Sequence, residues 1–506
     1  MNLALIHSRA VIGMDAPLVT VEVHLSLGLP AFSIVGLPEA SVKEAKERVR
    51  CALINAGFDW PARRITVNLA PADLPKEGGR FDLPIAIGIL AASEQCQSDK
   101  LANIELAGEL ALSGEIRPVH GIIPMVVSSQ QANRQLLLPE QNGAEAALVE
   151  ANHCLTANHL LAVTAWLNDQ QPLPIAENNQ ADCNAPEHPD LQDVIGQQQA
   201  KRALMIAAAG RHHLLFYGPP GTGKTMLASR LPGILPTMDD SEALESAAVY
   251  SISHQGFQAS NWRQRPFRAP HHSSSAVALV GGGSHPRPGE ISLAHRGVLF
   301  LDELPEFSRH VLDMLRQPLE SGQITISRAA RQLDFPAQFQ LIAAMNPSPC
   351  GNWGNPNVAC RSTPDEIRRY LNRLSGPLLD RFDMSLEVPA QPDQGLYQQV
   401  PDGPHSANVK QIVEQCYQHQ LDRQGCANGH LHGRVLQQHC QLNPDNSRLL
   451  QQIIEQFGLS ARAQQRILKV ARTLADLSES DTIESNHISE AIGYRAIDRL
   501  MQQLAT

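Results

Sequence analysis

The sequence contains few aromatic residues and no excess of positive charge. Aromatic residues make up 4% of its 506 positions, and 51 acidic residues against 41 lysines and arginines give a net charge of −10. Such a protein does not stack bases on many exposed rings, and its overall field does not attract polyanions. Any contact with nucleic acid must therefore come from a local basic patch.

The sequence also lacks a disulfide framework and a long apolar run. Its nine cysteines are scattered from position 51 to position 440, which fits a reducing compartment. Residues 1–7 lack the basic and apolar regions of a signal peptide, and the most apolar stretch, Leu83–Ala92, is too short to span a bilayer. We expect a cytoplasmic protein without a membrane anchor.

One polar segment separates the chain into two parts. Residues 168–192 are rich in Asn, Gln, Pro and acidic residues and follow neither hydrophobic period, as is typical of a solvated linker. With 43% hydrophobic residues, the chain can form a hydrophobic core on each side of this linker. We predict an α/β domain over residues 1–167, a second α/β domain over 193–391 and a helical domain over 392–506.

Hydrophobic periodicity predicts the elements of these parts. Before the linker we expect strands at Val19–Leu25, Ile65–Leu69 and Leu136–Pro139, a strand pair over Ile104–Leu112, and helices at Ser41–Ala56 and Leu83–Ala92. After it we expect a helix at 198–211, strands at His213–Tyr217, Val298–Leu301, Phe339–Ala344 and Ser385–Val388, and mainly helices from about residue 406.

A glycine-rich loop has the spacing G-x-x-x-x-G-K-T, between an apolar strand and a helical segment. Its glycines let backbone N–H groups curl around phosphates, and the following helix N-terminus adds partial positive charge. The lysine is expected to reach the β- and γ-phosphates of ATP, and the last threonine to ligate Mg²⁺. The loop consists of Gly218, Pro219, Pro220, Gly221, Thr222, Gly223, Lys224 and Thr225.

Two further polar groups follow apolar strands. Asp302 and Glu303 end the run Gly297-Val-Leu-Phe-Leu, the pattern in which an aspartate holds Mg²⁺ and a glutamate polarises the attacking water. Asn346 ends the next strand, where its amide can lie beside the γ-phosphate; the alternative is an ordinary turn residue before proline. We therefore predict ATP hydrolysis with Mg²⁺ held by Thr225 and Asp302.

Several motifs together resemble the AAA+ ATPases. These are Asp193–Gln197 (DVIGQ), the phosphate loop, Asn346 and Leu379–Asp383 (LDRFD). The segments Arg265–His272 (RPFRAPHH), Gly281–Gly283 and Pro288–Gly297 resemble the magnesium-chelatase branch. Over residues 1–500 the chain resembles the ComM/YifB family of competence-related AAA+ proteins.

This resemblance implies further roles. Val194 and Ile195 would contact the nucleotide, Arg381 would be an arginine finger acting on a neighbouring subunit's ATP, and Arg462 would be a second arginine sensor. An isolated arginine on a helix is otherwise usually just solvated. The family is taken to act as a hexamer.

Two segments are candidates for DNA contact. Residues 261–297 hold five arginines and four histidines but one acid, and include Arg268, His271 and His272. A ring would concentrate this charge near its axis; packing between subunits is the alternative. Residues 323–335 predict a hairpin with Arg328 and Arg331 at its tip. Such contacts neutralise phosphates, so we expect binding to single-stranded or branched DNA by structure rather than sequence.

A metal site of the family is incomplete in this sequence. The family commonly has four cysteines after the sensor asparagine, but here two of them are Ser348 and Ser362, leaving Cys350 and Cys360. Serine is a poor neutral ligand for structural zinc, so we expect none, although His271 or His272 could complete a shell. A disulfide between the two cysteines is a lesser alternative, disfavoured in the cytoplasm.

The N-terminal part resembles the Lon-protease catalytic fold (ribosomal S5 domain 2-like), through Pro75–Pro84 and Ala107–Val119. Such proteases need a serine nucleophile and a lysine. Gly79–Pro84 offers no serine, His120–Met125 offers no lysine, and Ser113 falls in the wrong strand. We expect a non-proteolytic domain that organises a ring or guides DNA.

These observations favour a hexameric ATP-driven DNA motor, by resemblance a branch-migration helicase of recombination and natural transformation. Recombination proteins are further candidate partners. The alternative is a magnesium-chelatase-like ATPase that remodels a protein partner for metal insertion. A protein-remodelling or proteolytic machine is a third class, and the missing serine and lysine count against it.

Overall fold

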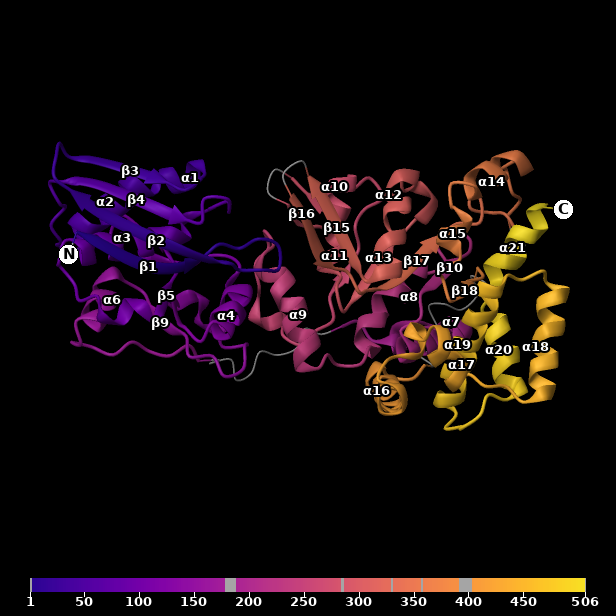
Figure 1. The fold of residues 1–506 in the computed structure, drawn as a ribbon. Helices are drawn as coiled ribbons and strands as arrows, with labels where there is room; N and C mark the ends of the chain where they lie inside the picture. Colours follow the sequence, from indigo (N-terminus) through magenta and orange to yellow (C-terminus); the bar gives the residue numbers. More distant parts are fainter. Residues whose placement is uncertain are drawn as a thin grey trace. The chain divides into compact units, whose positions relative to one another are not determined.

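The computed structural model describes residues 2–177, 188–283, 286–328, 331–355, 358–390 and 403–505 (Figure 1). The chain forms two compact units. The first comprises Met1–Ala185, Leu244–Trp262 and Ser327–Phe335; the second comprises Pro186–Ala243, Arg263–Ile326 and Pro336–Thr506. No helix among the described residues is both long enough and apolar enough to cross a membrane.

The first unit contains a seven-stranded mixed sheet in the order β3-β4-β2-β1-β5-β8-β9. Strands β1, β2 and β4 pair antiparallel, and the remaining neighbours pair parallel. Buried residues alternate with more exposed ones along β1, β2 and β4, so each of these three strands buries one face. The strands are β1 (Leu3–Arg9), β2 (Leu18–Ser26), β3 (Ala31–Val35), β4 (Arg64–Ala70), β5 (Ile104–Leu106), β8 (Gln135–Pro139) and β9 (Leu155–Ala157).

Helix α3 (Asp82–Ala92) is the centre of this unit, with all of its residues buried. After its first residue, Asp82, the helix is apolar all round, because no face of it meets water. The expected helix over Ser41–Ala56 is instead two helices, α1 (Ala40–Lys43) and α2 (Ala45–Asn55). The other helices up to residue 167 are α4 (Ile122–Gln131), α5 (Gly143–Ala146) and α6 (Leu160–Leu167).

The expected strand pair over Ile104–Leu112 is divided between two sheets. Strand β5 joins the large sheet, whereas β6 (Glu109–Leu110) pairs with β7 (Ile116–Arg117). The chain turns between them because Gly108 exchanges backbone hydrogen bonds with Arg80 and Leu83, at the start of α3. Ser113 lies in the turn between β6 and β7, not in a strand as expected.

The second unit is built on a five-stranded parallel sheet in the order β11-β14-β17-β10-β18. Its central strands are fully buried apolar runs, as parallel sheets covered on both faces require. The strands are β11 (Phe267–Arg268), β14 (Val298–Leu301), β17 (Gln340–Met345), β10 (Leu214–Tyr217) and β18 (Met384–Glu387). Strands β10, β14, β17 and β18 agree with the expected strands to within a residue, whereas β11 was not expected.

Helices and short strand pairs complete the chain, and from Ser406 onward it is helical. The two-stranded pairs are β12 (Gly281–Gly282) with β13 (Arg287–Pro288) and β15 (Gln323–Arg328) with β16 (Arg331–Pro336), the latter matching the expected hairpin. The helices are α7 (Gln198–Gly210), α8 (Lys224–Arg230), α9 (Asp240–Ser251), α10 (Ala276–Val280), α11 (Glu290–Leu293), α12 (Arg309–Met314), α13 (Arg316–Ser321), α14 (Pro364–Leu371), α15 (Gly376–Leu379), α16 (Ser406–Gln424), α17 (Gly433–His439), α18 (Pro444–Gln456), α19 (Ala461–Leu477), α20 (Ser485–Gly493) and α21 (Ala496–Ala505).

Candidate functional site

The predicted site residues follow three neighbouring strands of the parallel sheet. Gly218 comes directly after β10, Asp302 after β14 and Asn346 after β17, which lies between the other two. Because parallel strands end at the same edge of a sheet, their following loops meet there. The sheet order therefore brings the glycine-rich loop, the Asp-Glu pair and the asparagine together.

The loop after β10 needs glycine at defined positions. A Cβ on Gly218 would lie 2.2 Å from the carbonyl oxygen of Val388, so only glycine fits against β18. Gly221 and Gly223 have φ angles of +78° and +83°, a region that disfavours side chains. The Thr222 hydroxyl donates to the Pro219 carbonyl at 3.1 Å and closes the loop on itself. The result is a loop whose backbone can approach phosphates closely.

Lys224 points back across this loop. Its ammonium donates to the carbonyls of Gly218 and Pro219, both at 2.8 Å, and to Asn346 Oδ1 at 3.2 Å. Burial lowers the pKa of Lys224 to about 8, although the nearby Asp302 carboxylate raises it. The lysine is thus held at the loop by neutral oxygens, and an anion placed there would favour its charged form.

Thr225 and Asp302 meet as predicted for a pair of cation ligands. The Thr225 hydroxyl donates to Asp302 Oδ2 at 2.6 Å, and the other Asp302 oxygen accepts the backbone N–H of Glu303 at 2.9 Å. A hydroxyl and a carboxylate are the hard oxygen ligands that Mg²⁺ prefers. The two residues therefore fit a magnesium ion between the loop and the Asp-Glu pair.

The carboxylate of Glu303 lies beside His272, a residue that the sequence pattern predicts to contact DNA. Its Oε2 atom lies 3.2 Å from Nδ1 of His272, and its backbone has a φ of +52°, which is rare for a residue with a side chain. The His272 ring also contacts Phe307 edge-on and lies 4.1 Å from the His271 ring between centroids, with the two histidine rings tilted by 34°. This role could not be predicted from the sequence, because only the fold brings the segment after β11 beside the end of β14.

Asn346 joins the lysine to a helix beyond the site. Its side-chain oxygen accepts from Lys224, and its backbone N–H donates to the phenolic oxygen of Tyr370 on α14. Burial is the main cause that raises the pKa of Tyr370, so this phenol stays protonated at neutral pH. The asparagine is therefore positioned by both neighbours, as a residue that orients a substrate must be.

Arg381 and Arg462 lie together near the end of the sheet at which its parallel strands begin, opposite the glycine-rich loop. Arg381 precedes β18, so it is at the edge where β10 begins rather than where the glycine-rich loop follows it. It forms an ion pair with Glu320, and the adjacent Asp380 is 3.7 Å from Arg462 on α19. Burial and the positive charges of Arg466 and Arg462 lower the pKa of Arg381. No sequence signal pointed to Glu320.

The segment before α7 reaches the glycine-rich loop through Gln197. The Gln197 amide donates to the carbonyl of Thr222 at 3.5 Å and to that of Pro389 at 3.4 Å. Val194 is fully buried in the hydrophobic core of this unit, and Ile195 is partly buried. The segment expected to contact a nucleotide therefore borders the loop, although the Val194 side chain serves the core.

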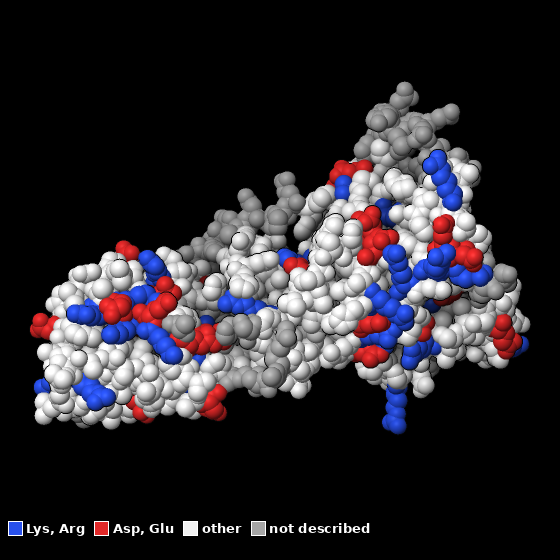
Figure 2. Space-filling model, turned by 90° about the horizontal axis from the view of Figure 1, so that it is seen from above, with Lys and Arg blue, Asp and Glu red and all other residues white. Residues whose placement is uncertain are grey.

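The basic segment over residues 261–297 is largely neutralised by acids. Arg268 forms a two-point salt bridge with Glu290 at 2.6 and 2.7 Å, and Arg265 is 2.7 Å from Glu242. On the face shown in Figure 2, basic and acidic side chains are interspersed. The structure thus gives Arg268 a packing role, and its contact with DNA stays a prediction. The side chains of Arg328 and Arg331 lie outside the described residues.

The loop after Asn346 contains the two cysteines that remain of the family's four-cysteine pattern, at which we expected no zinc. Their sulfur atoms are 3.4 Å apart, and Ser348 Oγ lies 3.4 Å from the sulfur of Cys350. The Ser362 hydroxyl accepts the Cys350 backbone N–H at 3.2 Å. Among the described residues, no group of three or more His, Cys, Asp or Glu side chains has the arrangement of a metal site.

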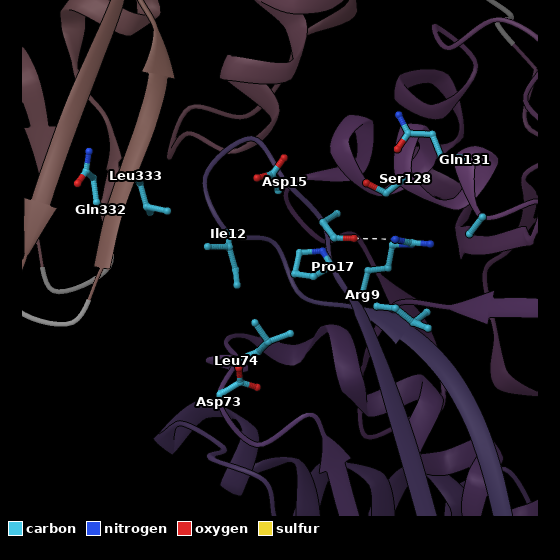
Figure 3. A pocket seen from close by; sticks show the side chains of 13 residues that line it. Arg9, Ile12, Asp15, Pro17, Asp73, Leu74, Ser128, Gln131, Gln332 and Leu333 are labelled. Carbon is cyan, nitrogen blue, oxygen red and sulfur yellow. Dashed lines mark hydrogen bonds between the residues drawn. The ribbon is translucent and has the colours of Figure 1, made fainter.

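A cavity of about 890 Å³ lies in the first unit (Figure 3). Its basic residue, Arg9, donates to the Ala16 carbonyl at 2.7 Å, the bond drawn in Figure 3, and to Glu105 at 2.5 and 2.8 Å. The hydrogen bonds of the Arg9 guanidinium are therefore made within the fold. Leu74 and Leu333 also line the cavity, and we assign it no ligand.

Comparisons with known proteins identify the same family throughout. Residues 190–396 match the family described as "Magnesium chelatase, subunit ChlI", residues 21–142 match "Subunit ChlI of Mg-chelatase", and residues 403–495 match "Magnesium chelatase, subunit ChlI C-terminal". The AAA+ domain of this family implies the use of ATP and Mg²⁺, in agreement with the chemistry of Lys224, Thr225 and Asp302.

Full-length relatives are more specific. The chain is 56% identical to "Competence protein ComM" of Haemophilus influenzae and 54% identical to YifB of Escherichia coli, over all of this chain and 100% and 99% of those proteins. It is 26% identical to the "Magnesium-chelatase 38 kDa subunit" of Cereibacter sphaeroides, over 38% of this chain and 57% of that protein. The chain therefore belongs to the ComM/YifB family of magnesium-chelatase-like AAA+ ATPases.

Proposed function

We propose that this protein is an ATP-hydrolysing DNA motor that works as a ring, most simply a hexamer, in the cytoplasm. In this proposal it is a branch-migration helicase that extends heteroduplex in homologous recombination and natural transformation. The residues 1–167 form a non-proteolytic Lon-like domain, and the helices of residues 392–506 form a lid. Recombination proteins are its expected partners besides DNA.

The proposal that the subunits form a ring rests on the position of Arg381. Strands β10 and β18 pair in parallel over four residues, a length of about 13 Å. Gly218 follows the end of β10, while Arg381 precedes the beginning of β18. An arginine at that edge cannot reach a nucleotide on its own subunit's loop. It can serve only a nucleotide held by a neighbour, and head-to-tail contacts of this kind form rings when the rotation between subunits closes.

The residues of one subunit then divide the work of hydrolysis. Lys224 and the backbone of the glycine-rich loop bind the phosphates, Glu303 accepts a proton from the attacking water, and Asn346 orients that water. Magnesium, held by Thr225 and Asp302, supplies positive charge where negative charge develops. Arg381, and Arg462 beside it, would stabilise the same charge from the neighbouring subunit.

DNA is the partner that relatives and sequence favour together. The full-length relative from Haemophilus influenzae is named a competence protein, and the β15–β16 hairpin ends in Arg328 and Arg331. The segment with His271 and His272 lies between β11 and Glu303 in the sequence, and His272 contacts the Glu303 carboxylate. DNA bound to this segment could therefore change the position of that carboxylate.

The alternative is a magnesium-chelatase-like ATPase that remodels a protein partner for metal insertion. It is favoured by the match of residues 190–396 to the chelatase family. It is disfavoured because the chelatase subunit aligns with 38% of this chain, whereas the ComM and YifB relatives align with all of it.

The test is the ATPase rate alone, with single-stranded DNA, with a four-way junction, and with a porphyrin and its partner proteins. The DNA motor predicts stimulation by DNA, most by the junction, and a smaller stimulated part in the Arg328→Ala/Arg331→Ala variant. No stimulation by any DNA in a verified oligomer at low salt would reject the motor, and stimulation by the porphyrin mixture alone would support the alternative.

A further inference from the structure

Two thiols lie side by side next to the nucleotide site. Cys350 and Cys360 are both partly exposed, and their sulfurs are separated by 3.4 Å. A disulfide requires about 2.0 Å between sulfurs, so a movement of little more than 1 Å would join them. The two residues are ten positions apart in the sequence, so the bond would close a short loop.

The surroundings of Cys350 favour its reactive form. Its desolvation raises the pKa of the thiol, but hydrogen bonds from Ser348, Ser362, the Asn352 backbone and Cys360 outweigh this and lower the pKa to about 5. Cys350 is therefore a thiolate at neutral pH. The thiolate is the form that attacks a disulfide, and its partial exposure admits a small oxidant.

The loop that carries these thiols is tied to the hydrolytic site. Asn346 is four residues before Cys350, and Ser348 between them is completely buried. Gly351 packs against the glycine-rich loop, since a Cβ on it would lie 2.7 Å from Pro220 and 3.9 Å from Asn346 Cγ. A movement of Cys350 is thus transmitted to the residues that hold Lys224 and orient water.

The other thiol is connected to the same asparagine by a second route. Cys360 is followed by Thr363, the N-cap of α14, whose side chain forms a capping box with Glu366. Tyr370 on that helix accepts a hydrogen bond from the Asn346 backbone. A bond between Cys350 and Cys360 would therefore join the two segments that position Asn346.

We propose that Cys350 and Cys360 form a reversible disulfide in exchange with small disulfides of the oxidised-glutathione class, and that this bond slows ATP hydrolysis. The effect on hydrolysis rests on the function proposed above, whereas bond formation does not.

The exchange proceeds in two balanced steps. The Cys350 thiolate attacks one sulfur of the small disulfide, which breaks its S–S bond and releases one small thiol. The Cys360 thiolate then attacks the sulfur of Cys350, forms the protein disulfide and releases the second small thiol. The two protein thiols lose two electrons and two protons, and the small disulfide gains them. An excess of small thiol reverses both steps.

The first test treats the full chain with oxidised glutathione and measures the intact mass and the linked peptides. We expect a product lighter by two hydrogen atoms, with Cys350 linked to Cys360, that reverts with reduced glutathione. The Cys360→Ser variant should stop at the mixed disulfide on Cys350. The Cys426→Ser variant, a control at another partly exposed thiol of the same unit, should form the bond like the parent.

The outcomes of this test separate the possibilities. No Cys350–Cys360 peptide in the parent protein, or a linkage of either thiol to another cysteine, would overturn the proposal. Stoichiometric zinc in the purified protein, lost in Cys350→Ser and protecting both thiols from oxidation, would overturn it too. Because the peptide map uses the parent protein, the result does not depend on any variant folding.

The second test compares the ATPase rate of each protein before and after oxidation. The parent and Cys426→Ser should lose about tenfold or more on oxidation, because displacing an orienting group by about 1 Å is costly, and regain it on reduction. Cys360→Ser should not show this loss. A fully bonded parent with an unchanged rate would overturn the proposed slowing. A reduced protein without ATPase activity would instead reject the proposed function and leave bond formation standing.

Discussion

The imidazole of His272 lies 3.2 Å from the carboxylate of Glu303, through Nδ1 and Oε2. An imidazole this close to a carboxylate competes with the water that a general base must reach. His272 therefore restrains the hydrolytic glutamate, and it belongs to a segment between β11 and β14 that an external partner could move.

Replacing this histidine should release the glutamate. We expect His272→Ala to raise the ATPase rate without DNA several-fold and to shrink the further increase caused by DNA. His271→Ala is the control, since the ion pair with Glu303 is made by His272, whereas the His271 ring nitrogen contacts Ser273 at 2.8 Å. The Glu303→Gln variant should bind ATP without turnover. If the basal rate of His272→Ala fell to the rate of Glu303→Gln, His272 would assist hydrolysis instead of restraining it.

Nucleotide binding should depend on the protonation of Lys224. Its pKa is lowered to about 8 by burial, and phosphates favour the charged form, so binding takes up a proton above that pH. We expect the affinity for a non-hydrolysable ATP analogue to weaken about tenfold between pH 7 and pH 9. Calorimetric titration measures this, with Lys224→Arg as the variant that stays charged. An affinity that is constant over this range would contradict the shift.

The buried Glu145 should make the first unit more stable in mild acid. Burial raises its pKa from 4.5 to about 7, despite hydrogen bonds from Ser251 and Asn142. The folded state thus holds a proton that the unfolded state has lost, so its contribution is full below pH 4.5 and is lost as pH rises through 7.

Glu145→Gln removes this titration. We expect the variant to melt at a higher temperature than the parent at pH 8 and at a similar or lower temperature at pH 4.5, in thermal unfolding followed by calorimetry. An equal difference between the two proteins at both pH values would contradict the assignment of the titration to Glu145.

Local motifs made much of the site predictable. Gly218–Thr225, Asp302 and Asn346 each follow an apolar strand, and a parallel sheet necessarily brings such strand ends together. Four of the five strands of the parallel sheet were predicted, because each is a short and mainly buried run, whereas the partly buried two-residue β11 was not.

The pairings between distant residues were not predictable. The contacts of His272 with Glu303, Glu320 with Arg381 and Arg268 with Glu290 join segments that only the folded sheet brings together. The division of the expected Ser41–Ala56 helix at Glu44 was not predicted either. Arg48 on α2 binds Asp82 at the start of α3, another tertiary contact that periodicity does not reveal.

The most direct test of a site shared between subunits is a mixing experiment. Arg381→Ala subunits keep an intact glycine-rich loop, and Lys224→Ala subunits keep the arginine; each alone should be nearly inactive. Random mixing in equal amounts should create an intact site at roughly a quarter of the interfaces. We predict an ATPase rate for the mixture well above that of either variant alone. A mixture no more active than the average of the two variants, in verified mixed oligomers, would contradict a site completed by Arg381 of the neighbour.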